Sequence, residues 1–75
     1  GDTLLHWAIR KHATSLARKL LQNGVPTNLP NDEGQTPLHL AVSSKDLATC
    51  KLLVAAGASL HTKDKHGNSP VDLAM

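Results

Sequence analysis

The sequence predicts an all-α repeat protein, in which pairs of short helices stack into a solenoid. Three observations lead to this class. Small, apolar and turn-forming residues recur at a constant interval of 33 residues along the chain. Each interval carries two short stretches of apolar residues at helical spacing, separated by turn-forming residues. A fixed period of roughly 20 to 50 residues is typical of solenoids, whose units cannot bury their apolar faces alone.

The period is visible at several positions of the unit. It joins the sets Gly1, Gly34 and Gly67; Thr3, Thr36 and Ser69; Leu5, Leu38 and Val71; and Ala8, Ala41 and Ala74. No insertion or deletion interrupts it. Chance does not explain so many matches at one interval.

Each unit begins with a turn and a short helix. In the second unit, residues 31–35 are turn-forming, and Gly34 can take a positive φ. Thr36 is a good N-cap, and Pro37 suits the first helical position because it has no N–H to leave unsatisfied. The apolar residues of this helix are Leu38, Ala41 and Val42.

A second helix follows after a short turn. We expect Asp46 to cap it and Gly57 to be the left-handed residue after its end. Its apolar face comprises Leu47, Cys50, Leu53 and Val54. The first unit repeats the pattern with Leu5, Ala8 and Ile9, then Leu16, Ala17, Leu20 and Leu21, then Gly24.

These motif residues resemble those of ankyrin repeats. Residues 34–42 read Gly-Gln-Thr-Pro-Leu-His-Leu-Ala-Val, and residues 52–58 read Leu-Leu-Val-Ala-Ala-Gly-Ala. The resemblance covers the whole chain. It implies a repeat over residues 1–31 with a truncated turn, a complete repeat over 32–63 and the start of a further repeat over 64–75. It also implies hairpin-like fingers, inner helices lining a concave face and outer helices on the convex face.

The chain departs from the family pattern at a few positions. Leu4 stands where the family usually has proline, and Asp72 where it usually has histidine. The usual glycine-histidine pair between the helices is replaced by His12-Ala13 and by Lys45-Asp46. Among the three repeats, the third is the one whose packing these departures are expected to affect most. Because the chain starts within a turn and stops at Met75, midway along a helix, we expect it to be an excerpt from a longer array.

Composition excludes several classes of protein. The hydrophobic fraction is 40% and the charged fraction 19%, which is not the composition of a disordered chain. Trp7 is the only aromatic residue and the net charge is only +2, so we expect no nucleic-acid partner. No apolar run is long enough for a membrane-spanning helix, so we expect no direct membrane insertion. The single cysteine, Cys50, favours an intracellular protein, in the cytoplasm first and the nucleus second.

No group of residues predicts catalysis, a metal or a cofactor. His61 and His66 lie five residues apart, which is not the spacing of a helical zinc-ligand pair. The ankyrin resemblance implies that His6 and His39 bond back to the turn backbone. Cys50 falls on the apolar face of a helix, where we expect a core residue with no activating base beside it. The carboxylates are spread over turns and helix starts, so we expect no enzyme.

The expected function is therefore protein binding. The residues that the fold leaves free for a partner are Trp7, Arg10, Lys11, Asp32, Glu33, Gln35, Leu40, Ser43, Ser44, Lys65, His66 and Asn68, together with Asp2. Trp7 aligns with Leu40 and Leu73 and is either an aromatic anchor for a partner or a residue that only packs against its neighbours. Arg10 and Lys11 beside it would attract acidic side chains.

Two alternatives stay open at this point. Residues 1–10 are similar to a stretch of the ankyrin domains of membrane palmitoyltransferases, so the chain is alternatively a regulatory or substrate-recruiting part of a larger enzyme or membrane protein. In the other alternative, the chain is a purely architectural repeat that only extends a solenoid scaffold.

Overall fold

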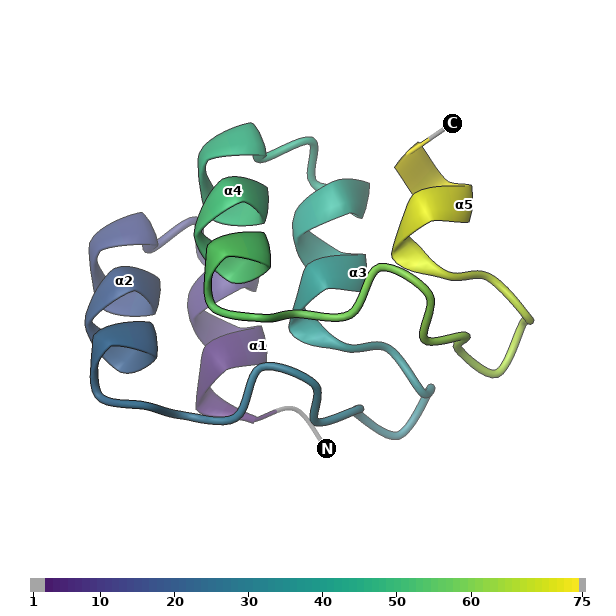
Figure 1. Ribbon diagram of the computed structural model, residues 1–75, viewed down its shortest axis with the longest axis horizontal. Coiled ribbons are helices and arrows are strands. Elements are labelled where there is room, and N and C mark those ends of the chain that lie inside the picture. Colours follow the sequence, from purple (N-terminus) through teal and green to yellow (C-terminus); the bar gives the residue numbers. More distant parts are fainter. Residues whose placement is uncertain (1–2, 75) are drawn as a thin grey trace.

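The computed structural model describes residues 3–74, which form two layers of stacked helices (Figure 1). This part of the chain contains α1 (Leu4–Arg10), α2 (Thr14–Gln22), α3 (Pro37–Ser43), α4 (Leu47–Ala55) and α5 (Pro70–Ala74), and no strand. The inner helices α1, α3 and α5 pack side by side, and the outer helix α2 packs on α4. The predicted all-α solenoid is confirmed. Gly1, Asp2 and Met75, to which the sequence analysis assigned places in the first turn and the last helix, lie outside the described residues.

Equivalent residues begin the inner helices. Thr3 caps α1 and Thr36 caps α3, and both have extended backbone angles. Pro37 lies in the first turn of α3, as predicted. At α5 the carboxylate of Asp72 accepts hydrogen bonds from the main-chain N–H of Ser69 at 2.9 Å and from its hydroxyl at 3.0 Å. The aspartate that replaces the family's histidine thus forms a capping box, and α5 begins 33 residues after α3.

The two outer helices begin differently. The carboxylate of Asp46 accepts bonds from the N–H of Thr49 at 3.2 Å and from its hydroxyl at 2.7 Å, so the predicted cap of α4 is confirmed. Ala13, at the equivalent position before α2, has no side chain that can cap. The residues just before them, His12 and Lys45, have φ of 56° and 57°. A left-handed conformation costs a residue with a β-carbon about 1–2 kcal/mol, so the lost glycines leave local strain.

The core lies between the layers and between neighbouring repeats. Its most buried apolar residues are Leu5, Ala8, Ile9, Ala17, Leu38, Ala41 and Leu53, all of them predicted core positions. Cys50 is half-buried and packs against this cluster. Leu47 and Val54 are 73% and 46% exposed, so only part of the predicted apolar face of α4 is buried among the described residues. α4 packs on α2 and α3, and these helices leave both side chains largely open to solvent.

Candidate functional site

Two turns project from the same end of the inner helices (Figure 1). We name residues 31–35 finger 2 and residues 64–68 finger 3. The main-chain N–H of Lys65 donates a hydrogen bond of 3.0 Å to the carbonyl of Glu33. This bond between the two fingers holds them side by side, in the order of the repeats to which they belong.

Side chains of equivalent residues close each finger from within. In finger 2, Asn31 Oδ1 accepts bonds from the main-chain N–H groups of Glu33 at 2.9 Å and of Gln35 at 3.0 Å. Asp64 makes the same two bonds in finger 3. They lower the pKa of the Asp64 carboxyl below its usual value, chiefly through the bond from Asn68. The backbone of both fingers is therefore fixed before any partner arrives.

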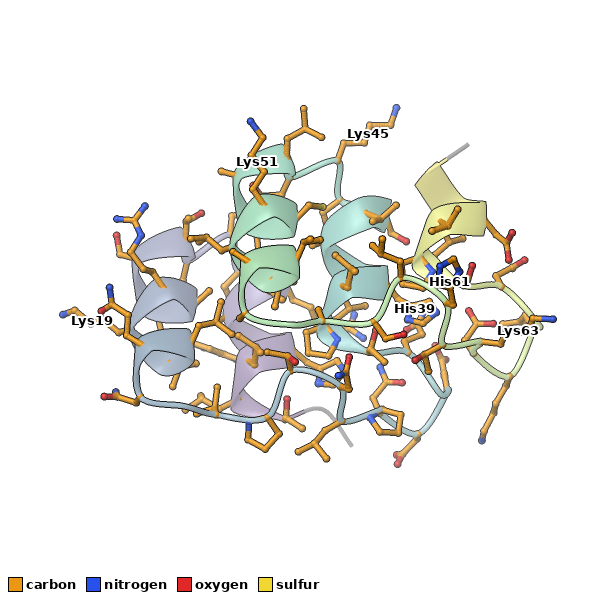
Figure 2. The ribbon with its side chains drawn as sticks, in the orientation of Figure 1. Lys19, His39, Lys45, Lys51, His61 and Lys63 are labelled. Carbon is orange, nitrogen blue, oxygen red and sulfur yellow. The ribbon has the colours of Figure 1, made fainter. Side chains whose placement is uncertain are left out.

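Buried histidines tie the inner helices to the fingers. His39 is a residue of α3 (Figure 2). Its Nδ1 accepts a bond of 2.9 Å from the main-chain N–H of Thr36, and its Nε2 lies 2.9 Å from the carbonyl oxygen of Asn68. Because Nδ1 accepts, the ring hydrogen is on Nε2, which donates to that carbonyl. His6 makes the equivalent bonds at 3.1 and 2.7 Å. The predicted bond to the turn backbone is confirmed, and the bond to the following finger is one the sequence analysis did not include.

A groove lies in the angle between finger 2 and the inner helices α1 and α3. It has a volume of about 540 Å³ and is lined by Arg10, Asn31, Asp32, Glu33, Gln35, Leu40, Ser43 and Ser44. All of these except Asn31 belong to the predicted partner-binding set. Asn31 was missed because its residue type and place indicate a turn, which is also a role it performs. Grooves of roughly 300–1,000 Å³ are the usual size for ligand sites in proteins.

The 33-residue period, the side-by-side fingers and the helix pairs agree with the match of residues 1–74 to the family described as "Ankyrin repeats (3 copies)". The chain belongs to the ankyrin repeat family. It is 40% identical over 81 residues to the nuclear factor NF-kappa-B p105 subunit of Gallus gallus, covering 99% of this chain and 8% of that protein. It is 36% identical over 74 residues to the putative palmitoyltransferase ZDHHC13 of Danio rerio, covering 99% and 12%. With the NF-kappa-B inhibitor alpha of Gallus gallus the identity is 35% over 78 residues, covering 99% and 24%.

Ankyrin repeats are protein-interaction modules. The chain spans at most 24% of the length of these three relatives, so it corresponds to one part of each of them. What the relatives share with it is the repeat itself. The partner therefore has to be inferred from this chain's own surface.

Leu40 is more buried than the sequence analysis expected. It was predicted to be free for a partner, but only 7% of it is exposed, so that prediction is wrong. The reason is that α3 has an inner helix on both sides, α1 and α5, which together enclose this position. Leu40 contributes only to the floor of the groove.

The remaining predicted residues lie outside the groove. They are Trp7, Lys11, Lys65, His66 and Asn68, all exposed. Trp7 occupies the position of Leu40 in the first repeat and is 48% exposed, because α1 has an inner helix on one side only among the described residues. Asn68 also has a structural role, since its carbonyl accepts the bond from His39.

Two aspartates of the described residues cap helices. A bond from the Thr49 side chain lowers the pKa of Asp46, and bonds from Ser69 lower that of Asp72. Burial, and then the charge of Asp46, raises the pKa of the Cys50 thiol, which keeps it protonated and unreactive. Within residues 3–74, no three histidine, cysteine or acidic side chains gather where a metal ion could bind. None of the described helices is both long and apolar enough to cross a membrane.

Proposed function

We propose that this ankyrin chain binds a partner protein or peptide segment in the groove beside finger 2. One observation carries the proposal: side chains from α1, finger 2 and α3 converge on a single groove, although they are far apart in the sequence. Except for Leu40, the core does not need these side chains. A rigid repeat stack loses little entropy on binding, so modest contacts from several elements add up to a useful affinity.

Residues outside the groove extend this surface in two directions. Trp7 and Lys11 lie on and after α1, and Lys65, His66 and Asn68 lie on finger 3, beside finger 2. We include them as secondary contacts of the same partner. The protein acts as a scaffold inside the cell, in the cytoplasm, where the free thiol of Cys50 stays reduced.

Site-specific photocrosslinking tests the proposal. A photoreactive amino acid replaces either Ser43, in the groove, or Lys19, which points outward from α2 (Figure 2). Both positions are exposed, so both variants are expected to fold. In cells, the Ser43 variant should crosslink to a specific protein and the Lys19 variant should not. Crosslinking of the same protein from Lys19 alone would place the binding surface on the outer helices.

A second candidate function is a regulatory or substrate-recruiting role within a larger enzyme or membrane protein. It is favoured by similarity to the putative palmitoyltransferase ZDHHC13 and, at 39% identity over 66 residues, to the potassium channel GORK of Arabidopsis thaliana. Sequencing the complete reading frame that contains these residues tests this function. A catalytic or membrane-spanning segment in the same frame would support it. A purely architectural role would instead follow if alanine substitutions throughout the groove left every interaction unchanged.

A further inference from the structure

The groove is polar and carries more negative than positive charge. Its charged lining residues are Arg10, Asp32 and Glu33, which are one cation and two carboxylates. Leu40 is its only apolar lining residue and is almost completely buried. An apolar anchor of a partner would therefore gain little contact area here, whereas a hydrogen-bond donor meets carboxylates, amides and hydroxyls.

Glu33 is the carboxylate available to such a donor. Both its main-chain groups are occupied, since the N–H donates to Asn31 Oδ1 at 2.9 Å and the carbonyl accepts from Lys65 at 3.0 Å. Arg10 and Asp32 already have interactions within the chain. No hydrogen bond or ion pair engages the Glu33 side chain among residues 3–74, and the residue is exposed. A fixed backbone thus presents one carboxylate on the wall of the groove.

We propose that the groove takes an extended segment of the partner that carries an arginine or lysine facing Glu33. This inference rests on the proposed function and names the chemistry of its partner. A guanidinium matches a carboxylate with two parallel hydrogen bonds, so arginine is preferred over lysine. The exposed residues Ser43 and Ser44 also line the groove, and their hydroxyls accept the remaining donors of the same side chain or of the partner's main chain.

Selection from a phage-displayed library of random twelve-residue peptides tests this inference. The bait is the whole 75-residue chain, as wild type, Glu33→Gln or Glu33→Arg. The control is Lys19→Ala, because Lys19 is exposed, points outward from α2 and does not line the groove. Circular dichroism melts confirm that each bait is folded. Glu33→Gln keeps the size of the side chain and the two hydrogen bonds that the main chain of residue 33 makes.

Peptides selected on the wild type and on Lys19→Ala should be enriched in arginine and lysine. They should bind Glu33→Gln about tenfold more weakly, because the bond to a charged acceptor is lost. Selection on Glu33→Arg should enrich aspartate and glutamate instead. Enrichment of apolar or acidic peptides on the wild type, or of no peptides at all, would overturn the inference. So would selected peptides that bind Glu33→Gln as tightly as the wild type.

A further variant, Ser43→Trp, fills the groove and separates this inference from the proposed function. Peptides that lose binding to Ser43→Trp but not to Glu33→Gln would leave groove binding standing and overturn only the preference for a cation. Peptides that are indifferent to Ser43→Trp would overturn the proposed function itself. Loss of binding to both variants supports both.

Discussion

Gly34 lies directly against the main chain of Lys65. A β-carbon built on Gly34 would be 3.0 Å from the main-chain nitrogen of Lys65 and 3.2 Å from Cα of Asp64. That nitrogen donates the bond to Glu33 that joins the two fingers. Gly34 also has φ of 76°, a left-handed conformation that favours glycine. Glycine is therefore needed here both for this conformation and because a β-carbon would crowd the main chain of finger 3. The groove wall depends on this contact, because finger 2 is that wall.

Gly34→Ala should lower the free energy of unfolding by on the order of 3 kcal/mol, of which about 1–2 kcal/mol comes from the left-handed conformation and the rest from the close approach. Gly67 is the matched control, since its φ is 81° but no atom lies within 4 Å of a built β-carbon. Gly67→Ala should therefore cost only about 1–2 kcal/mol. Urea unfolding followed by circular dichroism measures both. Equal losses would mean that the contact between the fingers adds nothing to the conformational effect.

Leu53→Ala should lower the free energy of unfolding by about 2–5 kcal/mol, because it opens a cavity at a completely buried position of α4. Leu47→Ala, on the same helix, should change it by no more than about 0.5 kcal/mol, since that side chain is 73% exposed. Thermal or urea melts of the two variants give the comparison. If Leu47→Ala were as costly as Leu53→Ala, the side of α4 that carries Leu47 would be packed in solution.

The contrast between these leucines shows what the sequence can predict and where its information ends. The 33-residue period and the turn residues predict the helices and the cap of α4, because local chemistry decides these, and they place Leu53 on the apolar side of its helix. A periodic pattern reports which side of a helix is apolar, but not which side a neighbouring repeat covers. Trp7 and Leu40 hold the same position in the repeat, yet their exposed fractions are 48% and 7%. Only the arrangement of neighbouring helices explains that difference.

The sequence analysis named most of the residues that line the groove but not their arrangement. The family pattern separates motif residues from variable ones, and seven variable positions do line the groove. The pattern does not tell which variable residues share one surface. Lys65 and His66 belong to the same predicted set but lie on finger 3, outside the groove. Such grouping depends on how one repeat is placed on the next, which in this chain is set by main-chain bonds such as that from His39 to Asn68.

Ala13→Asp should stabilise the chain. Ala13 precedes α2 without a side-chain cap, whereas Asp46, at the equivalent position, caps α4 through Thr49. An aspartate before α2 can accept a bond from the N–H of Leu16, and the expected gain is about 0.5–2 kcal/mol, typical of an N-cap. Ala13→Leu, which adds a side chain without an acceptor, is the control. The prediction fails if the leucine variant gains as much in a urea titration.

Acid should destabilise the chain through three aspartates that accept main-chain hydrogen bonds. The pKa values of Asp46, Asp64 and Asp72 are lowered in the folded chain from an ordinary value of 3.8. The unfolded chain therefore binds more protons near that pH, and stability rises with pH. The contribution of these groups is fully present well above pH 3.8 and is lost as the pH falls below it through their lowered values. Urea midpoints measured from pH 7 down to pH 2.5, on the order of one step per half unit, follow this loss.

Asp64→Asn is the matched variant for that experiment. Asn31 makes the same two main-chain bonds in finger 2 that Asp64 makes in finger 3, so asparagine at position 64 keeps the acceptor while removing the titration. The variant should stay folded at neutral pH and show a shallower loss of stability in acid. An unchanged acid profile would assign the acid sensitivity to other groups.

Lys45→Gly should raise the free energy of unfolding. Lys45 joins α3 to α4 with φ of 57°, which costs a residue with a β-carbon about 1–2 kcal/mol. Glycine removes that strain but has more conformational freedom to lose on folding, about 0.5–1 kcal/mol, so the net gain should be on the order of 0.5–1 kcal/mol. Ser44→Gly, one residue earlier at φ of −82°, has no strain to relieve and should lose stability instead. Opposite signs for two neighbouring glycine substitutions, measured in the same urea titration, would assign the gain to the left-handed backbone. A loss of stability in both variants would show that the folded chain tolerates the lysine without strain.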